Sequence, residues 1–134
     1  MIKTLVLDTN ALISLFKDAD SPVRRYLMKA GRLVIPLMSY GEFMVGVENQ
    51  QNVQKPELKL LDELLQTPNT EVHLPDKETA RIFARIYNQL RKQGTPIPTS
   101  DIWIAAETME VKGTLYSADG HFENVPLLDW IDGR

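Results

Sequence analysis

The strongest constraint on the fold is a regular alternation of short β-type segments with longer segments of helical periodicity. Ile2–Leu7 is rich in aliphatic residues, and a helical repeat follows at once through Ala11, Leu12, Leu15 and Phe16. Parallel strands need crossover connections, which are usually helices. The alternation therefore predicts an α/β fold, a three-layer α/β/α sandwich around a central, mainly parallel sheet. The other strands are expected at Arg32–Pro36, Thr70–Leu74, Thr114–Ser117 and, as a short last strand, Leu127–Trp130.

Capping residues mark the helices between these strands. Ser21 and Pro22 predict the start of a second helix, with serine as its N-cap, and Gly31 predicts its end. Asp76 and Gly94 bound a long amphipathic helix in the same way. Its expected inner face consists of Phe83, Ile86, Tyr87 and Leu90. The remaining helical segments are Met38–Val47 and Leu58–Leu65, which are joined as a hairpin through polar residues 49–55, and Asp101–Val111.

Length and composition limit the class of protein. With 134 residues and 43% hydrophobic content, residues 1–134 are expected to form one compact α/β domain with a single core. No apolar stretch approaches the ~20 residues that span a bilayer. The apolar run before Asp8 is also too short for a signal peptide. We therefore expect a cytoplasmic protein without a membrane segment.

The residue types available for metal binding are restricted. The chain has no cysteine and only two histidines, His73 and His121, which lie far apart in the sequence. Sulfur-ligated zinc and thiol nucleophiles are thereby excluded, and oxygen ligands favour hard cations such as Mg²⁺ or Mn²⁺. Both histidines are expected to be ordinary surface residues, although His121 is close enough to Asp119 in the sequence to reach a substrate bound there.

Four acids occupy positions that a parallel sheet would bring toward one rim. Asp8 ends the first strand, Asp119 follows the fourth, and Asp101 opens a helix. In open α/β sheets, the ligand crevice lies outside the carboxyl ends of the strands. Glu42 would join the other acids if its helix packs beside the first strand. Carboxylates held this close raise one another's pKa unless a cation neutralises them, so the sequence predicts a divalent metal site.

Each acid also has a purely structural interpretation, as a helix cap or as part of a turn. These are Asp8 as an N-cap, Glu42 in a capping box with Ser39, Asp101 in a helical first turn capped by Thr99 or Ser100, and Asp119 in an Asp-Gly turn. Only the expected joint placement of the four acids at one rim distinguishes a functional site from four separate structural roles.

These motifs resemble those of the PIN-domain nucleases and, within them, the VapC-type toxins of type II toxin–antitoxin pairs. The similar segments, in the same order along the chain, are Leu5–Ala11, Ser39–Gly46, Pro98–Ala106 and Ser117–Phe122. The resemblance implies an endoribonuclease that depends on Mg²⁺ or Mn²⁺. It implies catalytic roles for Asp8, Glu42, Asp101 and Asp119, with Asp8 and Asp101 as principal metal ligands and Asn10 and Ser117 as orienting residues.

The resemblance also implies an RNA substrate, a cognate antitoxin and a homodimer. Two surfaces are available for these partners, although each also has a plainer explanation as core packing or as a solvated helix face. An apolar surface is expected on the helical hairpin, at Phe43, Val47, Leu58, Leu61 and Leu65. The net charge of −3 does not indicate a nucleic-acid-binding protein, so RNA would need local basic residues. The candidates are Lys77, Arg81 and Arg85 on the outer side of the long helix, Arg91 and Lys92 at its end, and Arg24 and Arg25 beside another helix.

Three alternative functions follow from the same motifs. A haloacid-dehalogenase-type phosphatase also has an acid after its first strand, but it needs a second aspartate two residues later. Asn10 occupies that position here and argues against this class. A PIN nuclease of RNA processing that is not a toxin, and a non-catalytic PIN-like RNA-binding module, remain alternatives. The non-catalytic module would be favoured if acids of the pattern were missing, and none is.

Overall fold

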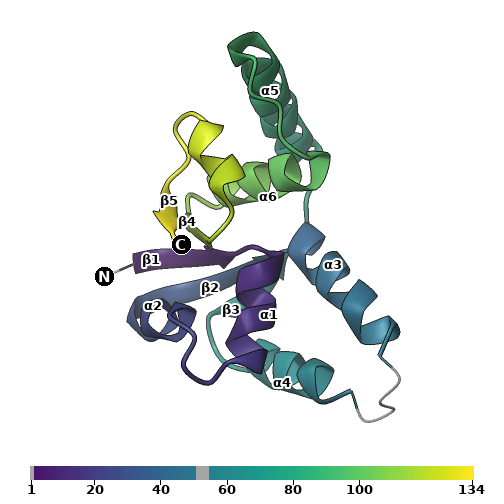
Figure 1. The fold of residues 1–134 in the computed structure, drawn as a ribbon. Helices are drawn as coiled ribbons and strands as arrows, with labels where there is room; N and C mark the ends of the chain where they lie inside the picture. The colour runs from purple at the N-terminus through teal and green to yellow at the C-terminus, as the bar shows by residue number, and fades with distance from the viewer. Residues whose placement is uncertain (1, 51–54) are drawn as a thin grey trace.

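The computed structural model describes residues 2–50 and 55–134. Its centre is a five-stranded sheet in the order β3-β2-β1-β4-β5, in which all neighbouring strands are parallel (Figure 1). The predicted α/β class with a parallel sheet is therefore confirmed. The strands are β1 (Ile2–Leu7), β2 (Ala30–Pro36), β3 (Thr70–His73), β4 (Thr114–Ser117) and β5 (Trp130–Asp132).

Helices cover both faces of this sheet, which makes the fold three-layered. One face is packed by α1 (Thr9–Lys17), α2 (Val23–Lys29), α3 (Leu37–Glu48) and α4 (Pro56–Leu65). The other is packed by α5 (Lys77–Gln93), α6 (Thr99–Glu110) and the 3₁₀ helix η1 (Gly120–Asn124). Figure 1 shows α5 and α6 above the sheet, and α1, α2 and α4 below it. Among the described residues, no helix combines the length and the apolar character needed to cross a membrane.

Successive side chains of the central strands point to opposite faces of the sheet, so each strand contributes to both hydrophobic cores. In β1, Leu5 and Leu7 contribute to the core beneath α1–α4, whereas Val6 contributes to the core beneath α5 and α6. Residues of β2 alternate in the same way, with Leu33 and Ile35 on the first side. Strands that are buried on both faces read as continuous apolar runs, which is why these segments could be recognised in the sequence.

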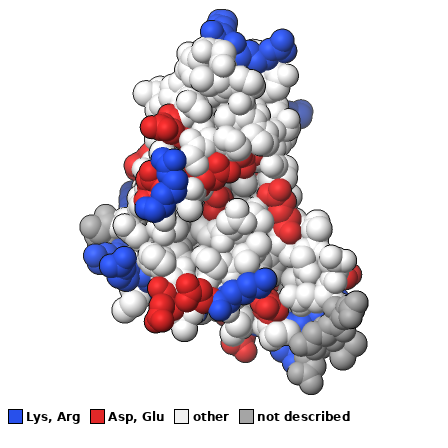
Figure 2. Space-filling model, in the orientation of Figure 1, with Lys and Arg blue, Asp and Glu red and all other residues white. Residues whose placement is uncertain are grey.

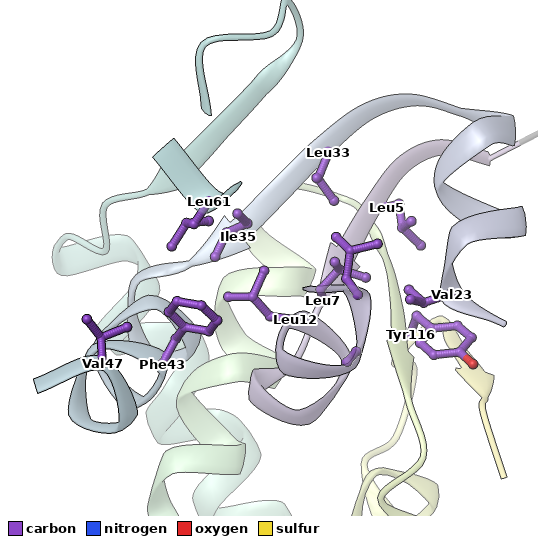
Figure 3. Packing of buried hydrophobic residues seen from close by; sticks show 12 residues of the cluster. Leu5, Leu7, Leu12, Val23, Leu33, Ile35, Phe43, Val47, Leu61 and Tyr116 are labelled. Carbon is purple, nitrogen blue, oxygen red and sulfur yellow. The ribbon is translucent and has the colours of Figure 1, made fainter. Parts of the chain in front are cut away.

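The helical hairpin contributes to this core more than to the surface. Phe43, Val47 and Leu61 are buried, with 4%, 2% and 0% of their surfaces exposed, and Figure 3 shows Leu61 next to Ile35 and Val47 next to Phe43. Leu58 and Leu65 are partly buried against the same cluster, so the expectation that these five residues form an interaction surface is wrong. The polar connection that joins α3 to α4 lies partly outside the described residues.

Several predicted boundaries are wrong for local backbone reasons. Leu127 has a φ of +64° and is 93% exposed, so the last strand begins only at Trp130. Gly31 lies inside β2, because the chain passes directly from α2 into that strand at Ala30. Ser21 bonds to the Ser14 hydroxyl instead of capping α2, whose N-cap is Pro22.

Smaller corrections concern the ends and inner faces of the elements around β3. Leu74 is exposed and lies beyond the end of β3. Tyr87 is also exposed, so it does not belong to the inner face of α5, which buries Ile86 and Leu90. The predicted caps of α5 are confirmed, because Asp76 forms a capping box with Thr79 and Gly94 ends the helix in the left-handed conformation.

A buried polar network connects α6, α3 and β3. Glu107 of α6 is only 1% exposed and accepts hydrogen bonds from the backbone N–H groups of Leu37 (2.9 Å) and Met38 (3.4 Å). These groups open α3, whose N-cap, Pro36, has no side chain that could accept them. The Nδ1 atom of His73 lies 2.8 Å from Glu107, and its Nε2 atom lies 2.8 Å from Glu110. The expectation that His73 is an ordinary surface residue is therefore wrong.

Substitution Glu107→Ala is expected to lower the free energy of unfolding by about 2–4 kcal/mol, because it leaves buried backbone donors and the His73 ring without their acceptor. Urea denaturation followed by circular dichroism measures this loss. The matched control is Glu78→Ala, which removes an exposed ion pair with Arg81 and should cost at most about 1 kcal/mol. Equal effects of the two substitutions would contradict the assigned role of Glu107.

Candidate active site

The strand order changes direction at β1, and the site lies at this point. The chain adds β2 and β3 on one side of β1, and then returns to add β4 and β5 on the other. In open parallel sheets, the crevice at such a switch point is the usual ligand site. Asp8 directly follows β1, and Ser117 is the last residue of β4, so both lie at the carboxyl edge of two adjacent strands.

Asp8 is held from both sides and is 5% exposed. It is the N-cap of α1, where its Oδ1 atom accepts from the Ala11 backbone N–H at 2.9 Å. Its Oδ2 atom accepts from the Ser117 hydroxyl at 2.5 Å. Burial raises the pKa of Asp8, and the charges of Asp101 and Asp119 add to the rise, whereas the two hydrogen bonds lower it. The residue is thus a helix cap and also a member of the acidic group.

Ser117 links two of the acids through one fully buried hydroxyl. The Oγ atom donates to Asp8 and accepts from the Asp119 backbone N–H at 2.9 Å. The Ser117 carbonyl accepts from the Trp130 indole (3.0 Å) and from the Gly133 backbone N–H (2.9 Å). The edge strand β5 therefore holds Ser117, and Ser117 in turn orients the acids.

Asp101 and Asp119 face each other across the side chain of His121. Asp101 lies in the first turn of α6, whose N-cap is Pro98, so the prediction that Thr99 or Ser100 caps this helix is wrong. Asp119 caps η1 by accepting from the His121 backbone N–H at 2.9 Å. The Nδ1 atom of His121 lies 3.1 Å from Asp101 Oδ2 and 3.1 Å from Asp119 Oδ1. His121 is therefore part of the site, contrary to its prediction as an ordinary surface residue.

The pKa of Asp101 is raised chiefly by burial, and the charges of Asp119 and Glu42 raise it further. The hydrogen bond and charge of His121 act in the opposite direction. The acidic group is thus under electrostatic repulsion that one histidine offsets only in part.

Glu42 joins this edge from the middle of α3. Its Oε1 atom accepts from the Thr9 hydroxyl at 2.5 Å, which links α3 to the start of α1. The capping-box interpretation of Glu42 is wrong, because α3 begins at Leu37 and Ser39 already lies inside it. Asp8 is buried, Asp101 and Asp119 are partly exposed, and Glu42 is exposed. The four acids therefore extend from the interior of the protein to its surface.

Asn10 is the predicted residue that the structure connects least to the acids. It lies exposed in the first turn of α1, and within the described chain no hydrogen bond joins it to an acid of the site. Sequence reasoning missed Thr9 and Glu107 as positioning residues. Thr9 could have been suspected because it follows Asp8 directly. Glu107 carried no local signal, because its backbone partner Leu37 is 70 positions away.

The surface around the acids is divided by charge and polarity. Acidic side chains gather near the middle of the face shown in Figure 2, and basic side chains lie beside them, in the lower middle and along the upper and left edges. A groove of about 330 Å³ adjoins Glu42. Its lining is largely apolar and includes Gly41, Val45, Pro75 and Trp103.

The donor set fits a divalent cation. One ligand atom each of Asp101, Asp119 and His121 lies within 4.8 Å of the others. Asp8, directly after β1, is not in that group of three, but it is near enough for the charges of Asp101 and Asp119 to raise its pKa. Hard divalent ions prefer oxygen ligands of this kind. Burial is the main cause of the raised pKa values of Asp8 and Asp101, and a bound cation would offset the repulsion between acids that adds to it.

Comparison with known families agrees with this geometry. A family model described as "PIN domain" matches residues 5–128. The chain belongs to the PIN-domain family. The resemblance inferred from the four sequence motifs is thereby confirmed.

Individual relatives of this PIN-domain chain span most of its length. It is 28% identical over 131 residues to "Ribonuclease VapC1" of Haemophilus influenzae strain R2866, covering 95% of this chain and 96% of the relative. It is 29% identical over 122 residues to "Ribonuclease VapC1" of Methanocaldococcus jannaschii, covering 90% of this chain and 80% of that protein.

Solved structures share the fold. The structure of VapBC-1 from nontypeable Haemophilus influenzae aligns with a TM-score of 0.82 at 25% identity, over 97% of this chain and 98% of that one. VapBC2 from Rickettsia felis, bound to a DNA fragment from its promoter, aligns with a TM-score of 0.82 at 18% identity, over 96% and 97% of the two chains. At that lower identity, the likeness concerns the fold alone.

Substitution Asp101→Asn is expected to raise the melting temperature of the metal-free protein at pH 7, because it removes a carboxylate whose ionised form the fold disfavours. Since folding raises the pKa of Asp101, the wild type gains protons on folding, and its stability falls as pH rises through that pKa. The advantage of the variant should therefore shrink as pH falls toward about 4, the range in which an ordinary aspartate is protonated.

Thermal denaturation in chelator at pH 4 and pH 7 measures this difference. Asp132→Asn is a control of opposite sign, because hydrogen bonds from Arg134 lower the pKa of Asp132, and its loss should not stabilise the protein. A lower melting temperature of Asp101→Asn at pH 7 would instead assign Asp101 a stabilising role in the helix.

Proposed function

We propose that this PIN-domain chain is a metal-dependent endoribonuclease and the toxin of a toxin–antitoxin pair. The observation that carries the proposal is the convergence of Asp8, Asp101 and Asp119, from three separate elements, on the switch point of the sheet. Relatives named Ribonuclease VapC1 that align along almost the full chain support it. Burying acids against one another costs stability, and such a cost is expected at sites that bind cations.

In this proposal, Asp8 and Asp101 are the principal ligands of Mg²⁺ or Mn²⁺, and Glu42 and Asp119 complete the acidic shell. Such an ion supplies positive charge against phosphate oxygens and acidifies water for phosphodiester hydrolysis. The Ser117 hydroxyl orients Asp8 and the Asp119 segment, and the Thr9 hydroxyl orients Glu42. We assign exposed Asn10 to substrate contact at the rim of the site.

We infer that single-stranded RNA approaches along two features beside the acids. The apolar groove next to Glu42, with Trp103 in its wall, suits an unstacked base. Lys77, Arg81 and Arg85 are exposed on α5 and suit phosphates, although Arg81 also pairs with Glu78. A groove of this kind favours single strands, because bases of a duplex remain stacked and paired.

A cognate antitoxin and a second copy of the chain are the proposed protein partners, and the cytoplasm is the proposed location. The structure of VapBC-1 from nontypeable Haemophilus influenzae, which aligns over 97% of this chain at 25% identity, supports an antitoxin partner. The described surface offers large exposed apolar side chains outside the core, including Met28 (86%), Val45 (70%) and Leu74 (72%). Apolar side chains of this size often mark protein interfaces where they form a patch.

Cleavage of single-stranded RNA is expected with Mg²⁺ or Mn²⁺ and not with EDTA. The double substitution Asp8→Asn/Asp101→Asn should lower the cleavage rate by about 10³-fold, equivalent to about 4 kcal/mol of transition-state stabilisation. Gel assays on a labelled oligoribonucleotide measure the rate, and circular dichroism checks the fold. Glu78→Gln, which changes an exposed acid on α5, is the matched control. Unchanged cleavage by the folded double variant would refute the mechanism, whereas RNA binding without cleavage by the wild type would favour the non-catalytic RNA-binding module.

Expression of the wild-type chain in bacteria is expected to arrest growth, and expression of the Asp8→Asn/Asp101→Asn variant is not. Co-expression of a neighbouring reading frame that encodes the antitoxin should restore growth and yield a complex on size-exclusion chromatography. Efficient RNA cleavage in vitro without growth arrest would favour the alternative of a PIN nuclease that acts in RNA processing.

A further inference from the structure

One nitrogen ligand lies among the oxygens of the acidic site. The Nδ1 atom of His121 is 3.1 Å from a carboxylate oxygen of Asp101 and 3.1 Å from one of Asp119. The three side chains can each present one ligand atom within 4.8 Å of the other two. The remaining histidine of the chain, His73, contacts Glu107 and Glu110 instead. His121 is therefore the histidine that could alter the chemistry of this site.

The turn that carries His121 is anchored on both sides. The His121 backbone N–H donates to Asp119 at 2.9 Å, so the same carboxylate fixes the backbone of the turn and faces the ring. Phe122, the next residue, is 1% exposed and packs into the core beneath α5 and α6. The imidazole is thus presented by a short, anchored 3₁₀ helix, and its Nδ1 atom faces both acids.

We propose that His121 is a direct metal ligand, and that Asp101, Asp119 and His121 together make the site select Mn²⁺ over Mg²⁺. This inference rests on the proposed function, because it concerns the ion of the same site. Mg²⁺ binds few nitrogen ligands and keeps a shell of oxygens and water, whereas first-row transition ions accept imidazole readily. Among the divalent first-row transition ions, Mn²⁺ binds ligands of this kind most weakly. A preference for Mn²⁺ over Mg²⁺ is therefore a demanding test of whether the imidazole coordinates the ion.

The opposing interpretation gives His121 a role only without metal. A proton on Nδ1 would let the ring donate to Asp101 and Asp119, so that it would hold the acids together and leave when a cation enters. Coordination through Nδ1 requires the other tautomer, with the proton on Nε2. The two interpretations predict opposite effects on ion affinity when the ring is removed.

Isothermal titration of Mn²⁺ and, separately, of Mg²⁺ into wild type and His121→Gln distinguishes the two interpretations. The substitution is expected to weaken Mn²⁺ binding about tenfold and Mg²⁺ binding much less, because glutamine retains only an oxygen ligand. Glu123→Gln is the matched control, since it changes an exposed acid on the same 3₁₀ helix and should leave the Mn²⁺-to-Mg²⁺ ratio unchanged. Tighter binding of both ions by His121→Gln, or equal weakening of both, would overturn the proposal.

Pulsed electron paramagnetic resonance of the Mn²⁺ complex tests the ligand directly. A coordinated imidazole gives ¹⁴N modulation, which we expect in the wild type and in Glu123→Gln and expect to be lost in His121→Gln. Mn²⁺ that binds and supports RNA cleavage without ¹⁴N modulation would overturn the role of His121 and leave the proposed function intact. Absence of any Mn²⁺ or Mg²⁺ binding by the wild type would overturn both.

Discussion

The site depends above all on the hydrogen bond between Ser117 and Asp8, which joins residues 109 positions apart in the sequence. It can form because β1 and β4 are adjacent parallel strands whose carboxyl ends meet at one edge. The same hydroxyl holds the backbone of Asp119, and Asp119 caps the helix that carries His121. The pairing of β1 with β4 thus brings the Ser117 hydroxyl to Asp8. Through this hydroxyl it also positions Asp119 and the short helix that carries His121.

A second set of contacts holds the helices that carry the other acids. Glu107 accepts hydrogen bonds from the first backbone groups of α3, and therefore ties the helix of Glu42 to the helix of Asp101. Burial is the main reason that the pKa values of Asp8 and Asp101 are raised, and the charges of the neighbouring acids raise them further. A divalent cation bound among these acids would offset the repulsion between their charges.

Much of the fold could be predicted because its signals are local. The apolar runs of β1 and β2 and the caps of α5, Asp76 and Gly94, lie within a few residues of the elements they define. The prediction failed at Leu127 and Gly31, where a left-handed backbone and a direct passage from helix to strand decide the boundary. It also failed for Phe43, Val47 and Leu61, because their burial depends on how α3 and α4 pack on the sheet.

The amino-acid sequence alone predicts the alternation of strands and helices. It also shows four acids of one pattern and no cysteine, and it places Asp8 directly after one strand and Asp119 two residues after another. These properties follow from side-chain periodicity and from residue chemistry. Both can be recognised from residues that are close together in the sequence. Three contacts depend on how the layers pack: β1 lies beside β4, Glu42 reaches the same edge, and His121 faces Asp101. These contacts join residues 20 or more positions apart, so they exist only once the layers have packed.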